Sequence, residues 1–279
     1  MKSGLAAILS SLPKKKPVTE LMLLFYVDEE YSFAGMKQFT REYQGKIQPK
    51  LIVSADGDGC AFGYACRGLI EFSATIKGKP GHAANPDSGI NAITGTAEAV
   101  EQLTTELKNY SSPELGPTSL NLAYMAGGQD QGLDSNKQPK LGQQGNIIPD
   151  VARIIIDIRP ATKSLTADKV IQLLHSELRR RRLALTDLNI RHDLGAWITP
   201  KTELRAVTRL INKPQFVNPS KRGYVDLQML WQTFDQVPCT TYGPGDPSCS
   251  HQPNEFVPIQ GINTASRFYK SLISSPDTI

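Results

Sequence analysis

One stretch of the sequence joins a run of apolar side chains to a run of negative charges, and few folds accommodate both. Residues 20–27 read ELMLLFYV, which is apolar after its first residue and typical of a buried strand. This run leads directly into three carboxylates, Asp28, Glu29 and Glu30. Like charges at the end of a buried strand repel one another and lose favourable hydration. Either these acids lie in solvent at the start of a helix, or a cation lies among them.

Helical and strand patterns alternate around this stretch. The helical segments 4–12 and 34–43 flank the apolar run, and a second apolar segment, PKLIVSA at 49–55, follows. The same rhythm returns after residue 199 and ends in a helical pattern at 258–273. Strands that alternate with helices are typical of a parallel sheet with helices on its faces. We therefore predict an α/β domain built mainly on a parallel sheet.

Residues 67–198 have a different pattern, which interrupts this rhythm. The segment RGLIEFSATIKG at 67–78 alternates apolar and polar residues, as a sheet with one exposed face does. The expected elements of the whole segment follow the order β-α-β-β-α-β, which is that of a split βαβ, or ferredoxin-like, unit. The sequence therefore predicts an α+β domain at 67–198, inserted between the two parts of the α/β domain at 1–66 and 199–279.

Composition excludes several classes of partner. Apolar residues make up 39% of the 279 residues and the mean hydropathy is −0.30, with no run long enough to cross a bilayer and no signal-peptide pattern. The net charge of +4 is small, and RRRR at 179–182 closes a predicted helix, which favours a solvated helix end over a nucleic-acid patch. None of the four cysteines has CxxC spacing, which favours reduced thiols in a cytoplasmic protein.

Two further predicted strand ends carry metal-binding side chains. The motif SADGDG contains Asp56 and Asp58, but it does not fit a calcium-binding EF-hand, because Cys60 and Arg67 stand where that loop needs ligands. A plain Asp-Gly turn remains the alternative. His251 follows the Gly/Pro-rich loop YGPGDPSCS. Carboxylates and an imidazole from three strand ends form a mixed set that suits zinc, and together they predict a metal site better than any one alone.

These motifs together resemble the M20 family of zinc-dependent aminoacylases and carboxypeptidases, in its acetylornithine deacetylase and succinyl-diaminopimelate desuccinylase branch. DEEYSFAG resembles the family's Glu-Glu motif, with its glycine five residues after the second Glu. RGLIEFSATIKGKPGHAANPDSGINAI resembles the opening of the family's lid domain, and NIIPDVARIIIDIRP and GPGDPSCSHQPNE resemble two further signatures. The resemblance implies a zinc-hydrolase domain in two parts, 1–66 and 199–279, and a lid and dimerisation domain at 67–198.

The resemblance also implies roles for individual residues. Glu29 matches the general acid/base, and Glu30 and His251 match ligands of one zinc. Asp56 matches the carboxylate of the other zinc, and we prefer it to Asp58 because of its spacing from the start of the lid domain. The implied reaction is amide hydrolysis, in which zinc, or cobalt or manganese in its place, lowers the pKa of water and Glu29 takes the proton.

Five residues match substrate-contacting positions of the family. His82 resembles a lid histidine that reaches the active site of a partner subunit and stabilises the oxyanion, although it could equally be a histidine that only hydrogen-bonds backbone. Asn146 and Arg159, thirteen residues apart, resemble a substrate-binding pair in which the arginine clamps a carboxylate. Gly243 and Gly245 of the GPG motif are the remaining substrate-binding candidates.

The chain departs from the family pattern near its start. The family's His-x-Asp strand lies upstream of the Glu-Glu pair, and its metal-bridging Asp lies immediately before the sequence that reads MKSGLAA here. Neither residue is present in 1–279, and His175 and His192 lie in the insertion, where they cannot replace them. We expect that the sequence is a fragment of a longer protein. A natural non-catalytic relative and a chain completed by a partner are the alternatives.

The sequence thus leads to one principal expectation of function. We expect a hydrolase that removes an N-acyl group from a small amino-acid substrate, works as a homodimer joined through the lid domain, and has no nucleic-acid or membrane partner. This chain alone is expected to be inactive, because its ligand set is incomplete. A dipeptidase or carboxypeptidase of the same family, and a non-catalytic ligand-binding homologue, are the competing hypotheses.

Overall fold

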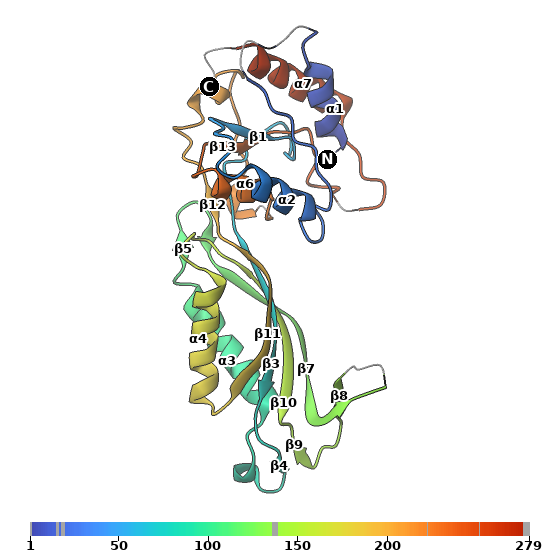
Figure 1. Ribbon diagram of the computed structural model, residues 1–279, viewed down its shortest axis with the longest axis vertical. Helices are drawn as coiled ribbons and strands as arrows, with labels where there is room; N and C mark the ends of the chain where they lie inside the picture. Colours follow the sequence, from blue (N-terminus) through green and yellow to red (C-terminus); the bar gives the residue numbers. More distant parts are fainter. Residues whose placement is uncertain are drawn as a thin grey trace. The chain divides into compact units, whose positions relative to one another are not determined.

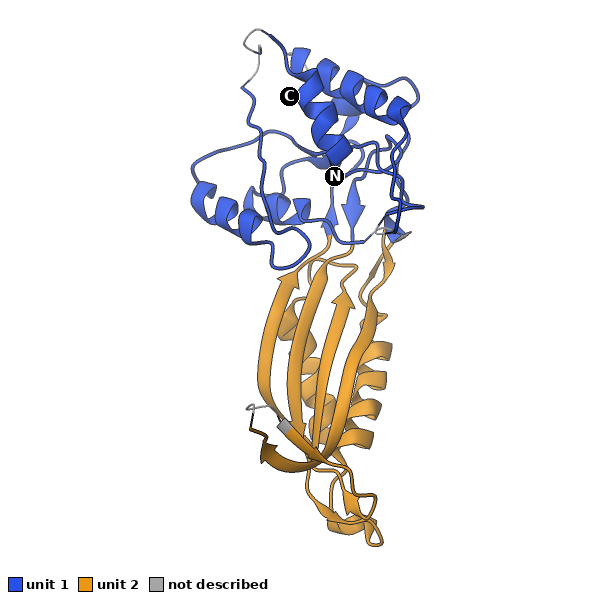
Figure 2. Cartoon of the chain, turned by 90° about the vertical axis from the view of Figure 1, so that its right-hand side faces the viewer, with its two compact units in different colours: residues 1–66, 197–279 blue, residues 67–196 orange. Residues whose placement is uncertain are grey.

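The computed structural model describes residues 2–14, 17, 20–135, 139–221, 223–250 and 252–275. Contacts divide the chain into two units, of which unit 1 contains residues 1–66 and 197–279 and unit 2 contains residues 67–196 (Figure 2). No helix in the described part of the chain is long and apolar enough to span a bilayer.

Unit 2 is built on an antiparallel sheet with the strand order β11-β3-β10-β7-β8 (Figure 1). Its main elements are β3 (Leu69–Lys77), α3 (Ala92–Leu107), β7 (Ser119–Leu133), β8 (Pro139–Gly142), β10 (Val151–Arg159), α4 (Ala167–Arg180) and β11 (Ala184–Leu194). Its short elements are β4 (Gly81–His82), η1 (Pro86–Ser88), β5 (Ser111–Ser112), β6 (Gly116–Pro117) and β9 (Ile147–Ile148). The order β3-α3-β7-β10-α4-β11 confirms the β-α-β-β-α-β order that the sequence predicts.

The period-two pattern explains why this sheet has one covered face. Alternate residues of β3 and β10, such as Phe72 and Ile156, point toward α3 and α4 and are fully buried. The two helices contribute the other side of the core with side chains such as Leu103 and Leu174. Each helix begins at a polar cap, since the Asn91 side chain accepts hydrogen bonds from two backbone N–H groups of α3 and Thr166 caps α4 in the same way.

The arginine run at 179–182 lies at the carboxyl end of α4, as the sequence predicts. Glu177, which is only 3% exposed, forms ion pairs with Arg180 and Arg181. A second carboxylate, from Glu98 on α3, lies 3.2 Å from Arg181. Part of the run is therefore engaged by acids of its own unit.

Unit 1 packs its helices around two short pairs of strands. Its elements are α1 (Lys2–Ser11), α2 (Ala34–Tyr43), β1 (Ile52–Ser54), β2 (Ala65–Cys66), β12 (Trp197–Ile198), α5 (Arg205–Thr208), η2 (Pro219–Lys221), α6 (Leu227–Thr233), β13 (Cys239–Thr241) and α7 (Ile259–Ser274). Strands β1 and β13 are parallel, and β2 and β12 are antiparallel. An aromatic core joins them to α7, with the ring of Phe62 4.8 Å from Tyr242 and 5.5 Å from Phe268.

The prediction of a strand at 21–27 is wrong for this structure. Residues 20–28 have no regular secondary structure, and Phe25 and Val27 are 55% and 75% exposed. The apolar pattern indicates burial, but a strand also needs neighbours that pair with its backbone. In the described part of the chain, β1 and β13 are the one pair of parallel strands, so no large parallel sheet is present to receive this segment.

This exposure predicts that Val27→Lys leaves folding stability nearly unchanged while it reduces self-association. The side chain loses little buried surface, so the free energy of unfolding should change by less than about 0.5 kcal/mol. Removing one side chain from an exposed apolar segment should lower the aggregate fraction seen by light scattering. Leu133→Lys, at a 64% exposed position of unit 2, is the matched control. A loss of several kcal/mol for Val27→Lys would instead show that the segment is buried.

Candidate functional site

The three acids that follow the apolar segment lie in a tight turn. The turn is closed by a hydrogen bond of 2.9 Å from the Phe33 N–H to the Asp28 carbonyl, and both residues have positive φ. The Asp28 carboxylate accepts a hydrogen bond of 3.1 Å from the Ala34 N–H, the first residue of α2. Asp28 therefore satisfies a helix N-terminus, while Glu29 is half-buried and Glu30 is exposed on the turn.

Gly35 holds this turn against the preceding segment. Its N–H donates to the Val27 carbonyl at 3.3 Å, and a Cβ added at Gly35 would lie 2.7 Å from that same oxygen. No larger residue fits without displacing the backbone. Close packing against the Val27 backbone thus explains why a glycine stands five residues after Glu30, the position that the sequence motif contains.

The carboxyl ends of β1 and β13 are joined by a set of backbone hydrogen bonds. Gly59 donates to the Gly245 carbonyl at 2.7 Å, Gly245 donates to the Gly57 carbonyl at 2.9 Å, and Cys60 donates to the Gly243 carbonyl at 2.8 Å. A Cβ on Gly57 would lie 2.3 Å from the Gly243 nitrogen, so the two chains approach more closely than side chains allow. We refer to residues 54–60 and 242–245 as the glycine junction.

The glycine junction positions Asp56 and gives Gly243 and Gly245 a structural role. Asp56 follows β1 directly, and its N–H donates to the Ser54 hydroxyl at 3.2 Å. A Cβ on Gly243 would lie 2.2 Å from the Ala55 carbonyl oxygen, and one on Gly245 would lie 2.9 Å from an Asp58 carboxylate oxygen. The structure thus brings together two of the three strand ends that the sequence singles out, while substrate contact by the two glycines stays a prediction.

A buried acid from α6 shares the electrostatic environment of Glu29 and Asp56. Asp226, only 2% exposed, precedes α6, and burial together with the negative charge of Asp56 raises its pKa to about 6, although a hydrogen bond from Tyr26 works against this rise. The pKa of Tyr26 is raised far above its usual value by burial and by the charges of Asp226, Glu29 and Asp56. Burial and the charges of Cys66, Asp226 and Glu29 raise the pKa of Tyr224 as well. Carboxylates from three segments therefore act on Tyr26, and two of them also act on Tyr224.

This crowding of negative charge suits a cation, but the described donors are too few to hold one. Within the described residues, no group of three or more His, Cys, Asp and Glu side chains lies close enough together to bind a metal ion. His251, the predicted imidazole ligand, lies outside the described residues. The described part of the predicted ligand set is therefore limited to Glu30 and Asp56, which does not make a complete zinc site.

In unit 2, two of the predicted substrate-contacting residues lie at one pair of short antiparallel strands. Strands β4 and β9 pair, with His82 opposite Ile147, and the Ala83 N–H donates to the Asn146 carbonyl at 2.9 Å. Nδ1 of His82 accepts a hydrogen bond of 3.1 Å from the Ala84 N–H. Both His82 and Asn146 are exposed. The structure thus shows a backbone contact for His82, and its role in catalysis stays a prediction.

Arg159 lies at the other end of the sheet and already holds a carboxylate. It is the last residue of β10, whereas the β4–β9 strand pair lies next to Val151 at the strand's start. Nε and Nη2 of Arg159 donate to the two oxygens of Asp157 at 2.8 and 2.9 Å. Asp157 was not predicted from the sequence, although residues two apart in a strand face the same side. Tyr26, Tyr224 and Asp226 were not predicted either. The one signal that the sequence contains for them is the position of Asp226, an acid among apolar residues.

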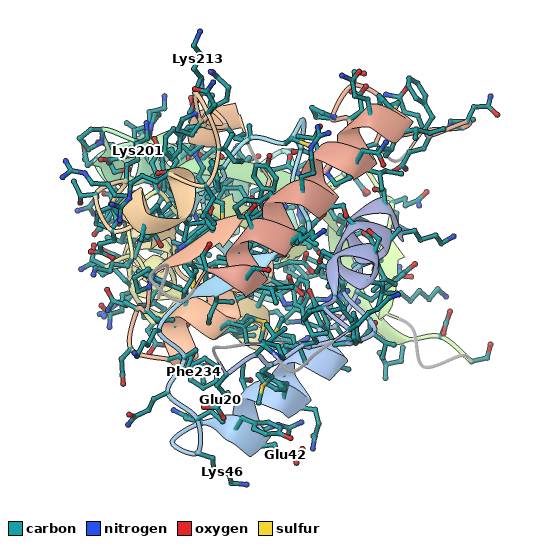
Figure 3. All side chains as sticks on the ribbon, turned by 90° about the horizontal axis from the view of Figure 1, so that it is seen from above. Glu20, Glu42, Lys46, Lys201, Lys213 and Phe234 are labelled. Atoms are coloured by element: carbon teal, nitrogen blue, oxygen red, sulfur yellow. The ribbon has the colours of Figure 1, made fainter. Side chains whose placement is uncertain are left out.

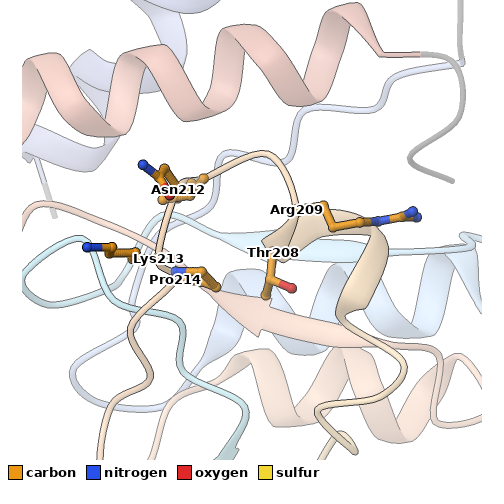
Figure 4. Close-up of a pocket in the computed structure, with 6 residues that line it drawn as sticks. Thr208, Arg209, Asn212, Lys213 and Pro214 are labelled. Carbon is orange, nitrogen blue, oxygen red and sulfur yellow. The ribbon is translucent and has the colours of Figure 1, made fainter.

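A separate cavity lies beside α5 and contains none of the predicted site residues. Its lining comprises Thr208, Arg209, Ile211, Asn212, Lys213 and Pro214 (Figure 4). Figure 3 shows Lys213 pointing outward, on the opposite side of unit 1 from Glu42 and Lys46. The lining has no carboxylate, imidazole or thiol, so this cavity does not explain the crowded acids.

Comparisons with known proteins identify similar sequences and one matching domain. The family model described as the peptidase dimerisation domain of M20 matches residues 64–184. The chain is 25% identical over 271 residues to a Mycobacterium tuberculosis protein named succinyl-diaminopimelate desuccinylase DapE, with 95% of this chain and 70% of that one covered. It is 25% identical over 270 residues to acetylornithine deacetylase of Proteus mirabilis, with 91% and 63% covered.

A solved structure has a similar fold. An M20 family metallo-carboxypeptidase from Sulfolobus solfataricus superposes with a TM-score of 0.61 at 14% identity, over 88% of this chain and 68% of that one. The chain spans between 54% and 70% of the length of the curated relatives that it matches. A matching dimerisation domain, relatives that extend over both units and a shared fold lead to one conclusion. This chain is a member of the M20 peptidase family, whose members are hydrolases of the deacetylase, desuccinylase or peptidase type.

Proposed function

We propose that the protein is a metal-dependent amidohydrolase that removes an acyl group from N-acyl amino acids. The observation that carries this proposal is the convergence of charge in unit 1, where Glu29 and Asp56 both act on Tyr26 beside the glycine junction. The names of the relatives support the deacetylase and desuccinylase type over other M20 activities. Four free thiols are compatible with a cytoplasmic location, which we propose with it.

Glu29 is the proposed general acid/base. It is half-buried, and its negative charge raises the pKa of Tyr26 and Tyr224. In this role its carboxylate takes a proton from the attacking water and gives it to the leaving amine. Glu30, Asp56 and His251 are the proposed metal ligands. A bound zinc ion supplies Lewis acidity and lowers the pKa of water.

Asp56 is a better ligand candidate than Asp58. Its charge acts on Tyr26 and on Asp226, so it lies near the acids of the proposed site. Asp58 instead forms an isolated bridge to Gly245 within the glycine junction. The preference that the sequence analysis based on spacing therefore has independent electrostatic support.

The geometry of unit 2 supports a dimeric active site. The eight residues that separate Val151 from Arg159 along β10 span about 26 Å at the usual strand rise. A small substrate is too short to contact both Arg159 and the β4–β9 strand pair, beside which His82 and Asn146 lie, in one chain. If all three residues bind one substrate, two copies of the lid domain must supply them, as the match to a dimerisation domain also suggests.

A peptidase activity is the second candidate. Its support is the shared fold with a metallo-carboxypeptidase. Both reactions hydrolyse an amide next to a carboxylate, so the residues have the same roles, and a panel of N-acetyl amino acids, N-succinyl amino acids and dipeptides separates them. A non-catalytic homologue is the third candidate, favoured by the incomplete set of described ligands.

We predict that residues 1–279, purified alone, bind zinc weakly and in less than one equivalent per chain. Catalytic zinc sites use about three protein ligands, and the described residues do not assemble that number. Elemental analysis after dialysis, with an assay of N-acyl amino-acid hydrolysis on the same sample, measures both quantities. Asp56→Asn should remove most of the residual binding, whereas the matched Asp58→Asn should not. Two tightly bound zinc ions per chain with robust turnover would contradict this prediction.

In a longer form of the protein that turns over substrate, Arg159→Lys should lower kcat/KM by tenfold or more. Lysine cannot make the two-pronged contact with a carboxylate that arginine makes, and hydrogen bonds to charged groups contribute about 1.5–3 kcal/mol. Esterifying the substrate carboxylate should cost the wild type heavily and the variant little. Equal losses in both proteins would remove Arg159 from this role.

In the same form, mixing His82→Ala with Glu29→Ala should restore part of the activity that each variant lacks alone. If His82 acts across the dimer, a mixed dimer contains one site with both residues intact, so up to about half of the sites in mixed dimers regain function. Activity measured against the fraction of mixed dimers, determined by native mass spectrometry, tests this. Mixed dimers that form without any recovery would show that His82 acts within its own chain or has no part in catalysis.

A further inference from the structure

His82 lies in a compact loop whose two ends are joined by backbone hydrogen bonds. The Lys79 N–H donates to the Ile90 carbonyl at 3.0 Å, and the Ile90 N–H donates to the Lys79 carbonyl at 2.8 Å. Residues 79–90, which we call the His82 loop, include β4 and therefore also pair with β9 (Figure 1). The loop is thus anchored where it begins, where it ends and along β4.

The interior of the His82 loop contains further contacts that fix its backbone. The Asn85 N–H donates to the His82 carbonyl at 2.9 Å, which closes a tight turn. The Ser88 hydroxyl donates to the Asn85 carbonyl at 2.7 Å. A Cβ added at Gly81 would lie 2.5 Å from the Ser88 hydroxyl oxygen, so the loop is closely packed across its middle. The backbone around His82 is therefore held by contacts that need no ligand.

The imidazole ring itself takes part in this local network. The Ala84 N–H donates a hydrogen bond of 3.1 Å to Nδ1 of His82. A ring nitrogen that accepts a hydrogen bond carries no proton, and a neutral imidazole has one protonated and one unprotonated nitrogen. The proton of the neutral ring is then on Nε2. The imidazolium form carries a proton on Nδ1 as well, so the bond from Ala84 exists only while the ring is neutral.

This assignment separates the roles that a histidine can have at a hydrolytic site. An unprotonated ring nitrogen can take a proton from water or bind a metal ion, whereas a protonated one donates a hydrogen bond. In His82 the unprotonated nitrogen, Nδ1, is already engaged by the backbone. The exposed side chain is left with Nε2 to offer to a ligand, and Nε2 offers a donor.

We propose that the His82 loop fixes the ring of His82 in the tautomer that carries its proton on Nε2, so that His82 acts on the substrate as a hydrogen-bond donor and not as a base. The Ala84 N–H is the positioning group in this proposal. The backbone contact of His82 thus has a purpose beyond structure, because it selects what the ring presents. The catalytic importance of the tautomer rests on the proposed function, whereas the tautomer itself does not.

Heteronuclear NMR of the ring nitrogens in residues 1–279 tests the tautomer without any need for activity. At alkaline pH, where histidine rings are neutral, His82 should show a single tautomer with Nδ1 unprotonated. His175 is the internal control, because it is exposed on α4 and should show averaged tautomers. Signals of His82 that are averaged like those of His175, or a proton on Nδ1 of the neutral ring, would overturn the proposal.

Two substitutions at His82 test the bond to Ala84. His82→Asn keeps an acceptor that reaches the N–H two residues further on, as in Asx-turns, whereas His82→Ala has none. Hydrogen exchange of the Ala84 N–H should accelerate roughly threefold to tenfold in the alanine variant, the range for one hydrogen bond, and stay close to wild type in the asparagine variant. The N–H groups of Lys79 and Ile90 serve as references. References that accelerate equally, or an Ala84 N–H that exchanges as in the wild type after His82→Ala, would contradict the proposal.

The activity of a longer form that turns over substrate connects the tautomer to the proposed function. His82→Asn keeps the bond to Ala84 but has no donor at the position of Nε2, so kcat should fall by about a hundredfold, as far as in His82→Ala. His82→Gln, whose amide N–H lies near that position, should recover part of kcat. Full activity of the asparagine variant would overturn the donor role and leave the tautomer standing. Averaged tautomers in a wild type whose activity both variants abolish would overturn the tautomer and leave the proposed function standing.

Discussion

The close approach of two backbones at the carboxyl ends of β1 and β13 is the constraint on which the candidate site depends. Gly57 and Gly243 leave no space for a side chain, and the reciprocal hydrogen bonds between residues 57–60 and 243–245 hold the two loops together. Because β1 and β13 are short, this contact extends their pairing beyond the strands themselves. Asp56 lies within this junction, and the loop that precedes His251 begins where the junction ends.

The charge distribution around the junction explains why this region is costly to the fold. Asp56, Glu29 and Asp226 all act on Tyr26, and burial makes the negative charge of Asp226 less favourable. In a region with only a structural role, such acids would destabilise the fold and bring no functional benefit. An arrangement that keeps carboxylates together near a polar surface is typical of a site that operates on charge, and this supports the metal-dependent reaction proposed above.

Several helices and strands could be predicted, because their patterns depend on residues that are close together in the sequence. The helix at 34–43 was predicted with the bounds that α2 has, and the alternation of residues 69–77 identified the covered face of the unit 2 sheet. The strand at 21–27 failed because its pattern indicates burial, which only neighbouring strands provide. The contact between Tyr26 and Asp226 joins residues 200 positions apart, and neither position carries a local signal of the other. Asp157 could have been identified from the period of the strand.

The pairing of Asp157 with Arg159 has a consequence for ligand recognition. A guanidinium that already holds an internal carboxylate does not attract every anion that diffuses past, because its charge is locally balanced. If Arg159 binds the substrate carboxylate as proposed, an incoming carboxylate must replace Asp157 or share the arginine with it, so recognition becomes an exchange of one carboxylate for another. Such an exchange gains little from charge alone and depends on how well the rest of the molecule fits. The shape of the ligand then determines which molecules bind, and free acids that match only the charge compete poorly.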